Sequence, residues 1–488
     1  MKKIICFYML IIFSLASCTA TPEQVPAGTL ALSSTPTETV APTTTPTKTP
    51  EATQIEVSYS VQPLILKDQS GLVDSRINSL VSGCIRNPVS DWSDWIKGLK
   101  YDGFTRTRFT LNFSDGPAVD LSYASIENHL PADYVELFRQ MKDSGIKTRY
   151  SLSFWDMVYR QNGGTISNDR LATEVETERY LAYVKMVATS LKGLVDSYEL
   201  WNEPDVNYDF YQRITPEDYI QVARRAIPLI REIDPQARIV LISTGSYIDE
   251  STQAYSMKIL QSDVIALADA ISLHTVNNDA SPVFHSEYYY GYDAMWKNIK
   301  QIAQANGFHG EYDADELNYR SNYSLNSLQP ESGDYHPYEP EIAAKYIGRM
   351  IAINLGLNIS VGTSGTDATA RPFEGNMIRN MAYLLDGLHA YSFPVSVKSE
   401  SKLIRYYTFI DDDGNKYVAI WDDGAAKVVS DNYAGSLKVE DTSAISVTAM
   451  DPFKSTMQEM KFVNNENEVL LDGINITDSP VIYKIEIR

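Results

Sequence analysis

The chain has 488 residues, and its 63 acidic side chains outnumber 42 lysines and arginines, which gives a net charge of −21. A surface this acidic argues against nucleic-acid binding, which rewards clustered lysine and arginine. Of the three cysteines, Cys6 lies in the apolar stretch at the N-terminus, Cys18 comes shortly after that stretch, and Cys84 stands alone. No intrachain disulfide is therefore expected, and stability must come from a large apolar core.

The first residues have the pattern of an export signal. Residues 2 and 3 are lysines, residues 4–13 are apolar, and Leu15-Ala16-Ser17-Cys18 closes the segment. A short apolar stretch of this kind predicts a signal peptide over residues 1–17 rather than a spanning helix. The closing residues resemble a bacterial lipoprotein signal, which implies lipidation of Cys18 and an extracytoplasmic protein anchored to the cell membrane. The alternative is an ordinary signal peptide with a chance cysteine.

Residues 18–55 are rich in threonine and proline, as in the run from Thr43 to Pro50. Such a composition cannot bury a core, so we expect an extended tether between the anchor and the folded part.

Residues 56–392 alternate between strand-like and helix-like patterns. Eight strand candidates separated by helices fit a closed (β/α)₈ barrel, which needs about 250 residues. The alternative is an open doubly wound sheet, but no glycine-rich phosphate fingerprint follows the first strand. The expected strands are Asn78–Cys84, Phe104–Leu111, Lys147–Leu152, Ser197–Trp201, Arg238–Ser243, Ala270–His274, Tyr312–Leu317 and Asn358–Gly362.

Two helix boundaries can be read from the sequence. The pattern Tyr134–Met141 predicts a helix that ends at Gly145. Another is expected to begin at Thr215-Pro216, with threonine as the N-cap and proline in the first turn.

Residues 393–488 have the pattern of an all-β domain, which we predict to be a small sandwich that packs against the barrel. Tyr406–Ile410 and Lys416–Trp421 read as strands joined by the turn Asp411–Asn415. A sugar-binding role for this domain, and calcium binding by the acidic turn, are the alternatives.

The segment Trp201-Asn202-Glu203-Pro204 follows the fourth expected strand of the barrel. In such barrels catalytic groups lie at the carboxyl ends of the strands. A carboxylic acid there can protonate a leaving oxygen, and a neighbouring amide can hold a sugar hydroxyl. The motif is therefore suited to cleavage of a glycosidic bond.

This segment resembles the Asn-Glu-Pro motif of the clan A glycoside hydrolases, and the wider Glu199–Asp205 looks most like family 39. The resemblance extends loosely over residues 56–488, because that family also appends a β-sandwich. It implies that Glu203 is the general acid/base, with Asn202 and Trp201 among the substrate-binding residues.

The second carboxylate is expected at the end of the seventh strand, where Glu316 matches the position of the family's nucleophile. Strand alternation places Glu316 on one face with Tyr312 and Ala314, and Asp313 and Asp315 on the other. Because a local bulge would reverse that parity, Asp315 is the alternative nucleophile.

The resemblance implies two further substrate-site residues. Arg108 matches an arginine near the nucleophile, with Arg106 on the same face as the alternative, although Arg108 could instead only pair with Glu199. His274 matches a histidine that shapes the sugar site. The family often has a tyrosine two residues after that histidine, where this chain has Val276. We expect its hydroxyl to come from the following loop, from Tyr288, Tyr289, Tyr290 or Tyr292.

Together these features predict a retaining glycosidase that acts on plant or microbial oligo- or polysaccharides. No cofactor or metal is expected, since the six histidines show no ligand spacing. The alternatives are another clan A activity, such as an endo-glycanase or arabinofuranosidase, and an inactive glycan-binding surface lipoprotein. A structural adhesin using the C-terminal domain is a further possibility.

Overall fold

The computed structural model describes residues 60–81, 92–109, 130, 132–154, 170–206, 213–276, 280–319, 321, 337–364, 371–465 and 467–487. The expected signal peptide, the tether, Cys18 and Cys84 lie outside these residues.

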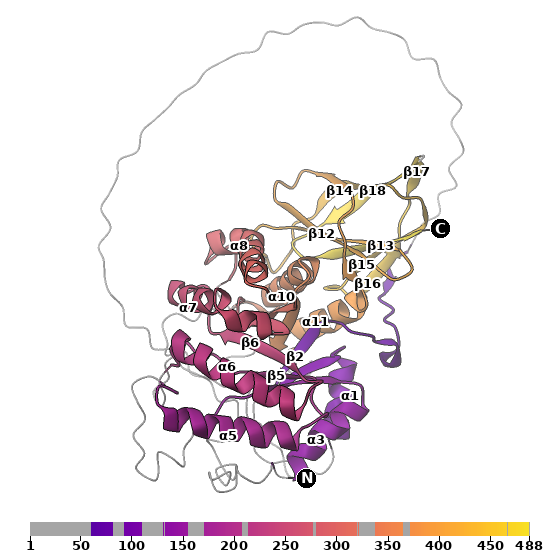
Figure 1. Cartoon of the computed structure of the whole chain (residues 1–488). Coiled ribbons are helices and arrows are strands. Elements are labelled where there is room, and N and C mark those ends of the chain that lie inside the picture. The colour runs from indigo at the N-terminus through magenta and orange to yellow at the C-terminus, as the bar shows by residue number, and fades with distance from the viewer. Residues whose placement is uncertain are drawn as a thin grey trace, which may run out of the picture.

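Eight parallel strands close into a barrel, as the sequence predicted (Figure 1). Each expected strand overlaps one in the barrel, whose order around the wall follows the chain. The strands are β2 (Ile77–Val81), β3 (Arg106–Phe109), β4 (Lys147–Ser151), β5 (Ser197–Glu199), β6 (Arg238–Thr244), β7 (Ala270–Leu273), β8 (Glu311–Leu317) and β9 (Ser360–Ser364).

Helices cover the outside of the barrel, and both predicted helix boundaries are present. Thr215 caps its helix by accepting a hydrogen bond from the Asp218 backbone, with proline in the first turn. Gly145 has φ +75°, a left-handed conformation that glycine adopts without the Cβ clash of other residues. The helices are α1 (Ser93–Tyr101), α3 (Ala132–Asp143), α5 (Glu174–Ser190), α6 (Pro216–Ile233), α7 (Glu250–Leu260), α8 (Ser286–Ala305), α10 (Pro340–Gly356) and α11 (Pro372–Leu385), with 3₁₀ turns η1 (Gln69–Gly71) and η3 (Asp263–Leu267).

The C-terminal residues form two antiparallel sheets that enclose a second apolar core, which includes Val418, Leu437 and Ile474. One sheet has the order β1-β16-β15-β19-β13-β12-β10, in which β1 is Gln62–Pro63, and the other has the order β11-β14-β18-β17. The strands are β10 (His389–Ala390), β11 (Val395–Ser399), β12 (Ile404–Ile410), β13 (Lys416–Asp422), β14 (Tyr433–Glu440), β15 (Ala444–Asp451), β16 (Thr456–Glu459), β17 (Val463–Asn465), β18 (Glu468–Ile476) and β19 (Val481–Ile487).

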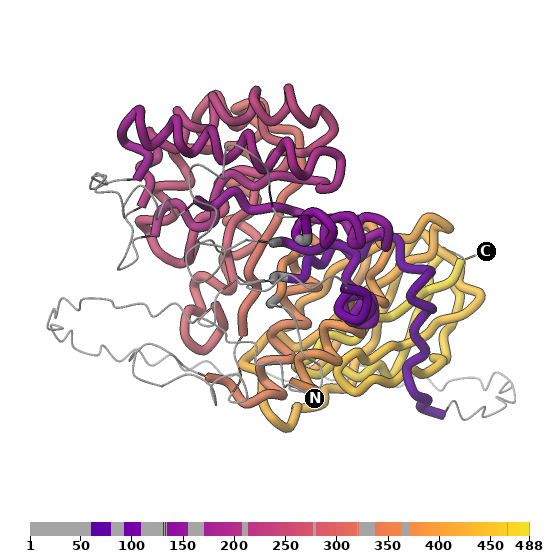
Figure 2. Tube along the Cα trace, turned by 90° about the horizontal axis from the view of Figure 1, so that it is seen from below, coloured from indigo at the N-terminus to yellow at the C-terminus, as the bar shows by residue number. Residues whose placement is uncertain are grey.

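An early segment of the chain joins this domain. Strand β1 (Gln62–Pro63), which precedes the barrel, pairs antiparallel with β16. Figure 2 accordingly shows the indigo start of the described chain alongside the yellow C-terminal strands. The sandwich is thus formed by residues after the barrel together with one short strand that precedes it.

Buried polar contacts join the sandwich to the barrel through α8 and α10. Arg349 of α10 has no exposed surface and donates to the carbonyl oxygens of Asp478, Gly424 and Asp422. Tyr289 of α8 donates to the Asp423 carboxylate at 2.7 Å. Since these partners lie in different domains, the buried bonds tie the two domains together.

None of the described helices is long and apolar enough to cross a membrane.

Candidate active site

Glu203 lies just beyond β5, where the chain leaves the barrel wall. Trp201 and Glu203 have φ of 88° and 48°, a left-handed conformation that is unfavourable for residues other than glycine. The Glu203 backbone N–H donates to the carbonyl oxygen of Ser243 at the end of β6, at 2.8 Å. This contact between neighbouring strand ends holds the turn, and such strain is typical of functional sites.

Glu316 lies at the matching end of β8 and also has a positive φ, of 63°. The register between β8 and β9 shifts between Ala314 and Leu317, which marks a bulge. The expectation that Glu316 shares a face with Tyr312 is wrong. Tyr312 points outward to Trp296 of α8, with ring centroids 6.1 Å apart. The bulge instead turns Glu316 towards the mouth of the barrel.

Asp315, the alternative nucleophile, lies inside the barrel below the mouth. It has no exposed surface, and its carboxylate accepts hydrogen bonds from Arg149 and from Ser272, the latter at 2.9 Å. A group fully engaged in buried pairing is not available to a substrate, so the geometry favours Glu316 as the reactive carboxylate.

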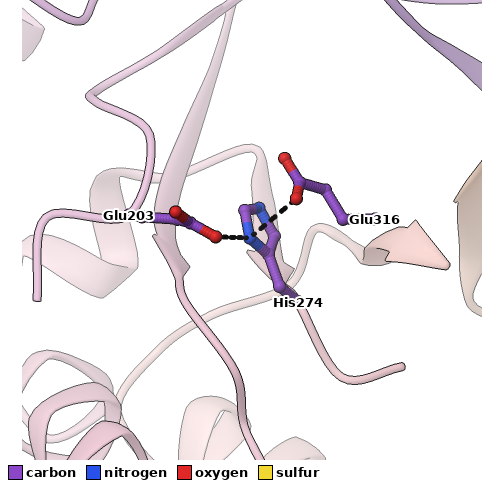
Figure 3. A group of neighbouring side chains, drawn as sticks. All are labelled: Glu203, His274 and Glu316. Carbon is purple, nitrogen blue, oxygen red and sulfur yellow. Dashed lines mark hydrogen bonds and ion pairs between the residues drawn. The ribbon is translucent and has the colours of Figure 1, made fainter. Parts of the chain in front are cut away.

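The two glutamates meet around His274, which follows β7 (Figure 3). Its Nδ1 lies 3.0 Å from Glu203 Oε1 and 3.7 Å from Glu316 Oε2. One oxygen of each carboxylate and the imidazole nitrogen all lie within 4.8 Å of one another. The Glu316 side chain is 24% exposed and that of Glu203 11%, so both carboxylates have access to solvent at the mouth.

The charge of His274 follows from these neighbours. Burial opposes protonation, but the carboxylates of Glu316 and Glu203 outweigh it and raise the pKa of His274 to about 9. The three side chains are spaced closely enough to hold a metal ion. Without a bound metal, the imidazole is protonated at neutral pH and shares its proton with the Glu203 carboxylate.

Arg108 of β3 bonds residues at the end of β5 and at the end of β8. Its Nη1 donates to Glu316 Oε1 at 3.0 Å, and its Nε donates to Glu199 Oε2 at 2.8 Å. Nη2 donates to both Glu199 and Asn202. Arg108 therefore pairs with Glu199 and contacts Glu316 at the same time. Arg106, the alternative, instead pairs with Asp74 and Glu311 away from this cluster.

Asn202 and Trp201 differ in their surroundings. Asn202 is half-buried, and its Oδ1 accepts a hydrogen bond from Arg108, which also donates to Glu316. Trp201 is only 2% exposed and packs against Tyr180 of α5, with Arg170 over its ring at 5.8 Å. The indole is therefore buried behind the site, and a contact between Trp201 and substrate stays a prediction.

The four tyrosines proposed to contact the nucleophile lie on α8 rather than in a loop, and their hydroxyls bond elsewhere. Tyr288 donates to the carbonyl oxygen of Thr275, and Tyr292 bonds to the Thr275 hydroxyl and to Asn354. Tyr289 and Tyr290 both reach Asp423 of the sandwich. That expectation is wrong as well, because the helix points these side chains towards its own packing neighbours.

Arg149 was not singled out from the sequence, and Asp313 was placed only on the strand face opposite Glu316. Arg149 of β4 is buried, pairs with both Asp313 and Asp315, and lies 3.9 Å from Glu199. The available signal was their charge: both occupy barrel strands, where a buried charge requires a partner.

Comparisons with known proteins place the fold. No family model matches the chain, and no curated protein matches it. The structure is similar to a family 39 glycoside hydrolase from the gut symbiont Bacteroides cellulosilyticus WH2, with 13% identity, a TM-score of 0.56, and 85% of this chain and 81% of that chain covered.

Two further solved structures are similar. One is a GH30 endoxylanase from Clostridium papyrosolvens C71, with 12% identity, a TM-score of 0.52, and coverage of 88% of this chain and 98% of that one. The other is a family 51 alpha-L-arabinofuranosidase from Bifidobacterium longum, with 11% identity, a TM-score of 0.52, and coverage of 88% and 99%. At such identities the likeness concerns the fold: a (β/α)₈ barrel with an appended β-sandwich.

Proposed function

We propose that this protein is a retaining glycoside hydrolase in which Glu316 is the nucleophile and Glu203 the general acid/base. The observation that carries the proposal is the approach of the two carboxylates, with an oxygen of each within 4.8 Å of the other at the strand ends. Carboxyl groups about 5–5.5 Å apart are typical of double displacement, whereas inversion needs about 6.5–9.5 Å for a water molecule.

The first step forms a covalent intermediate. A carboxylate oxygen of Glu316 attacks the anomeric carbon while the bond to the leaving oxygen breaks. Glu203 donates a proton to that oxygen, which departs as an alcohol. In the second step Glu203 removes a proton from water, and the water oxygen attacks the anomeric carbon. The bond from that carbon to Glu316 breaks, which releases Glu316 as a carboxylate.

The neighbouring groups suit these roles. Arg108 donates to Glu316 Oε1 and so fixes the orientation of the attacking group. The His274 imidazole and the Glu203 carboxylate share a hydrogen bond of 3.0 Å, which allows a proton to reside on the pair at neutral pH. Asn202, which shares the donor Arg108 with Glu316, is suited to hold the hydroxyl next to the reacting carbon.

The substrate we propose is an oligo- or polysaccharide fragment of plant or microbial origin. The similar folds include a named endoxylanase and a named arabinofuranosidase, which supports a carbohydrate substrate without selecting a sugar. We also propose that the enzyme is exported and anchored through a lipid on Cys18, as its first residues indicate.

A catalytically inactive glycan-binding lipoprotein is the rival function. Binding alone does not require two carboxylates within reach of one anomeric carbon, and this pairing favours an enzyme.

The test is hydrolysis of a panel of aryl glycosides, followed by NMR of the first-formed anomer and by mass spectrometry after reaction with 2-deoxy-2-fluoro glycosides. We expect retention of configuration and a covalent label on Glu316. First formation of the opposite anomer, or a label on Asp315, would contradict the mechanism. Glycan binding without hydrolysis of any substrate would support the rival function.

A further inference from the structure

The direction of the Glu316 side chain depends on the preceding residue, Asp315. We propose that Asp315 is a positioning residue, whose buried anchorage to Arg149 and Ser272, in the space left by Gly362, fixes the bulge that turns Glu316 into the barrel mouth. The proposal concerns the same site as the proposed function, but its geometrical claim can be tested without substrate.

The bulge changes which way Glu316 points. Along a regular strand, successive side chains alternate between the two faces. Asp313 and Asp315 face the interior, where both contact Arg149, and Tyr312 faces α8. Regular alternation would send Glu316 to the helix side with Tyr312. One extra residue in β8 and a positive φ at Glu316 bring its carboxylate to Arg108 instead.

Asp315 is the fixed point of this irregular segment. It has no exposed surface and accepts hydrogen bonds from three different strands: from Arg149 of β4, from Ser272 of β7 at 2.9 Å and from Asn78 of β2 at 3.3 Å. Because these donors converge from around the barrel, the carboxylate cannot rotate without breaking several bonds at once. The backbone of Asp315, and with it the backbone nitrogen of Glu316, is held in place.

Gly362 of β9 lacks a side chain, and this leaves space for Asp315 and for the backbone of the bulge. A Cβ at this position would lie 2.5 Å from Asp315 Oδ1 and 3.1 Å from both the Asp315 Cα and the Glu316 backbone nitrogen. Real Cβ atoms do not approach other atoms as closely as 2.5 Å, and here the third contact is the backbone of the bulge itself. Any larger residue must therefore displace Asp315 or the bulge.

The first test is Gly362→Ala in the full chain, with Gly98→Ala as the matched control. Gly98 lies in α1 with nothing within 4 Å of an added Cβ. Neither change alters charge, so the pKa of His274, followed by NMR, reports where the Glu316 carboxylate lies. We expect Gly362→Ala to lower that pKa by about one unit, because an opposite charge moves away from the imidazole, and Gly98→Ala to leave it unchanged. A change below about 0.3 unit in Gly362→Ala would overturn the proposal.

The second test is Asp315→Asn, which keeps the shape but removes the ion pair with Arg149. Its control is Asp74→Asn, which removes an ion pair with Arg106 elsewhere in the barrel. We expect kcat, and the rate of fluoro-glycoside labelling of Glu316, to fall by about 10²-fold in Asp315→Asn with KM little changed, because displacing a reacting group has this effect. Asp74→Asn should retain both rates. Equal losses in the two variants would indicate a merely structural role and overturn the proposal.

The proposed function and the positioning of Glu316 by Asp315 can fail independently. If the unmodified protein hydrolyses no glycoside and takes no label, the proposed function fails, but the His274 titration still decides whether Gly362 and Asp315 aim Glu316. If hydrolysis occurs but Gly362→Ala leaves the pKa of His274 unchanged, or Asp315→Asn and Asp74→Asn lose activity equally, the positioning proposal fails while the function stands.

Discussion

Arg108 donates from Nη1 to Glu316 Oε1 at 3.0 Å, although 208 positions separate the two residues in the chain. The same guanidinium also makes two bonds to Glu199, a carboxylate with no exposed surface. One planar side chain thus neutralises a buried acid and orients a proposed nucleophile. This double use makes the arginine difficult to replace.

Arg108→Lys is therefore expected to lower both stability and activity. A lysine ammonium cannot bond Glu199, Asn202 and Glu316 together, so we expect a loss of about 2–4 kcal/mol in unfolding free energy and about 10²-fold in kcat. Urea unfolding and aryl-glycoside kinetics measure the two effects. Arg106→Lys, two residues earlier on the same strand, should cost less stability, because Lys147 also pairs with Asp74, and should leave kcat unchanged. Equal kcat in both variants would contradict the role of Arg108.

Glu203→Gln should lower kcat by about 10²–10⁴-fold for substrates whose leaving group needs protonation. Substrates with highly activated leaving groups should be affected less in the first step. Glu203→Ala should regain turnover with azide, which replaces water as the nucleophile and needs no general base. Glu217→Gln, an exposed change on α6, serves as the control. Unaltered turnover in Glu203→Gln would remove its acid/base assignment.

Stability should fall at alkaline pH because of His274. Its pKa is raised from 6.5 to about 9 in the folded protein. The folded state therefore holds the proton more tightly than the unfolded chain. The resulting stabilisation is fully present below about pH 6.5 and lost as pH rises through about 9, with a size of about 3 kcal/mol. Unfolding free energies of the protein and of His274→Gln, measured across this window, should converge as pH rises. A constant difference between them would contradict the raised pKa.

Trp201→Phe separates packing from substrate binding. Because the indole is buried against Tyr180, the smaller ring should lower the unfolding free energy by about 1–3 kcal/mol. KM should stay within about twofold if the side chain does not touch the sugar. A large rise in KM with unchanged stability would place Trp201 among the substrate-binding residues.

Arg349→Met tests whether barrel and sandwich unfold together. The change leaves the carbonyl oxygens of Asp478, Gly424 and Asp422 without their buried donor, which should cost about 2–4 kcal/mol. If the domains are coupled, calorimetry should show one transition at a lower temperature rather than two. Arg224→Met, which removes only an exposed pair with Asp263, should have little effect. Separate transitions in the unmodified protein would contradict the coupling.

Local patterns in the sequence determined much of the fold. Alternating apolar runs located all eight barrel strands, and Thr215 and Gly145 marked helix ends, because hydrophobic periodicity and capping act over only a few residues. The positions of Glu203 and Glu316 at strand ends could also be read from the sequence, because strand ends in a barrel share one rim.

Tertiary structure decided where individual side chains point. The bulge at Glu316 and the left-handed turn at Trp201 depend on neighbouring strands, through Gly362, Arg149 and Ser243. Strand parity therefore failed at Glu316, and the motif gave no indication that the Trp201 side chain would be buried. The physical reason is that strained dihedrals and buried ion pairs persist only where distant residues converge on them. Periodicity in the sequence contains no information about such convergence.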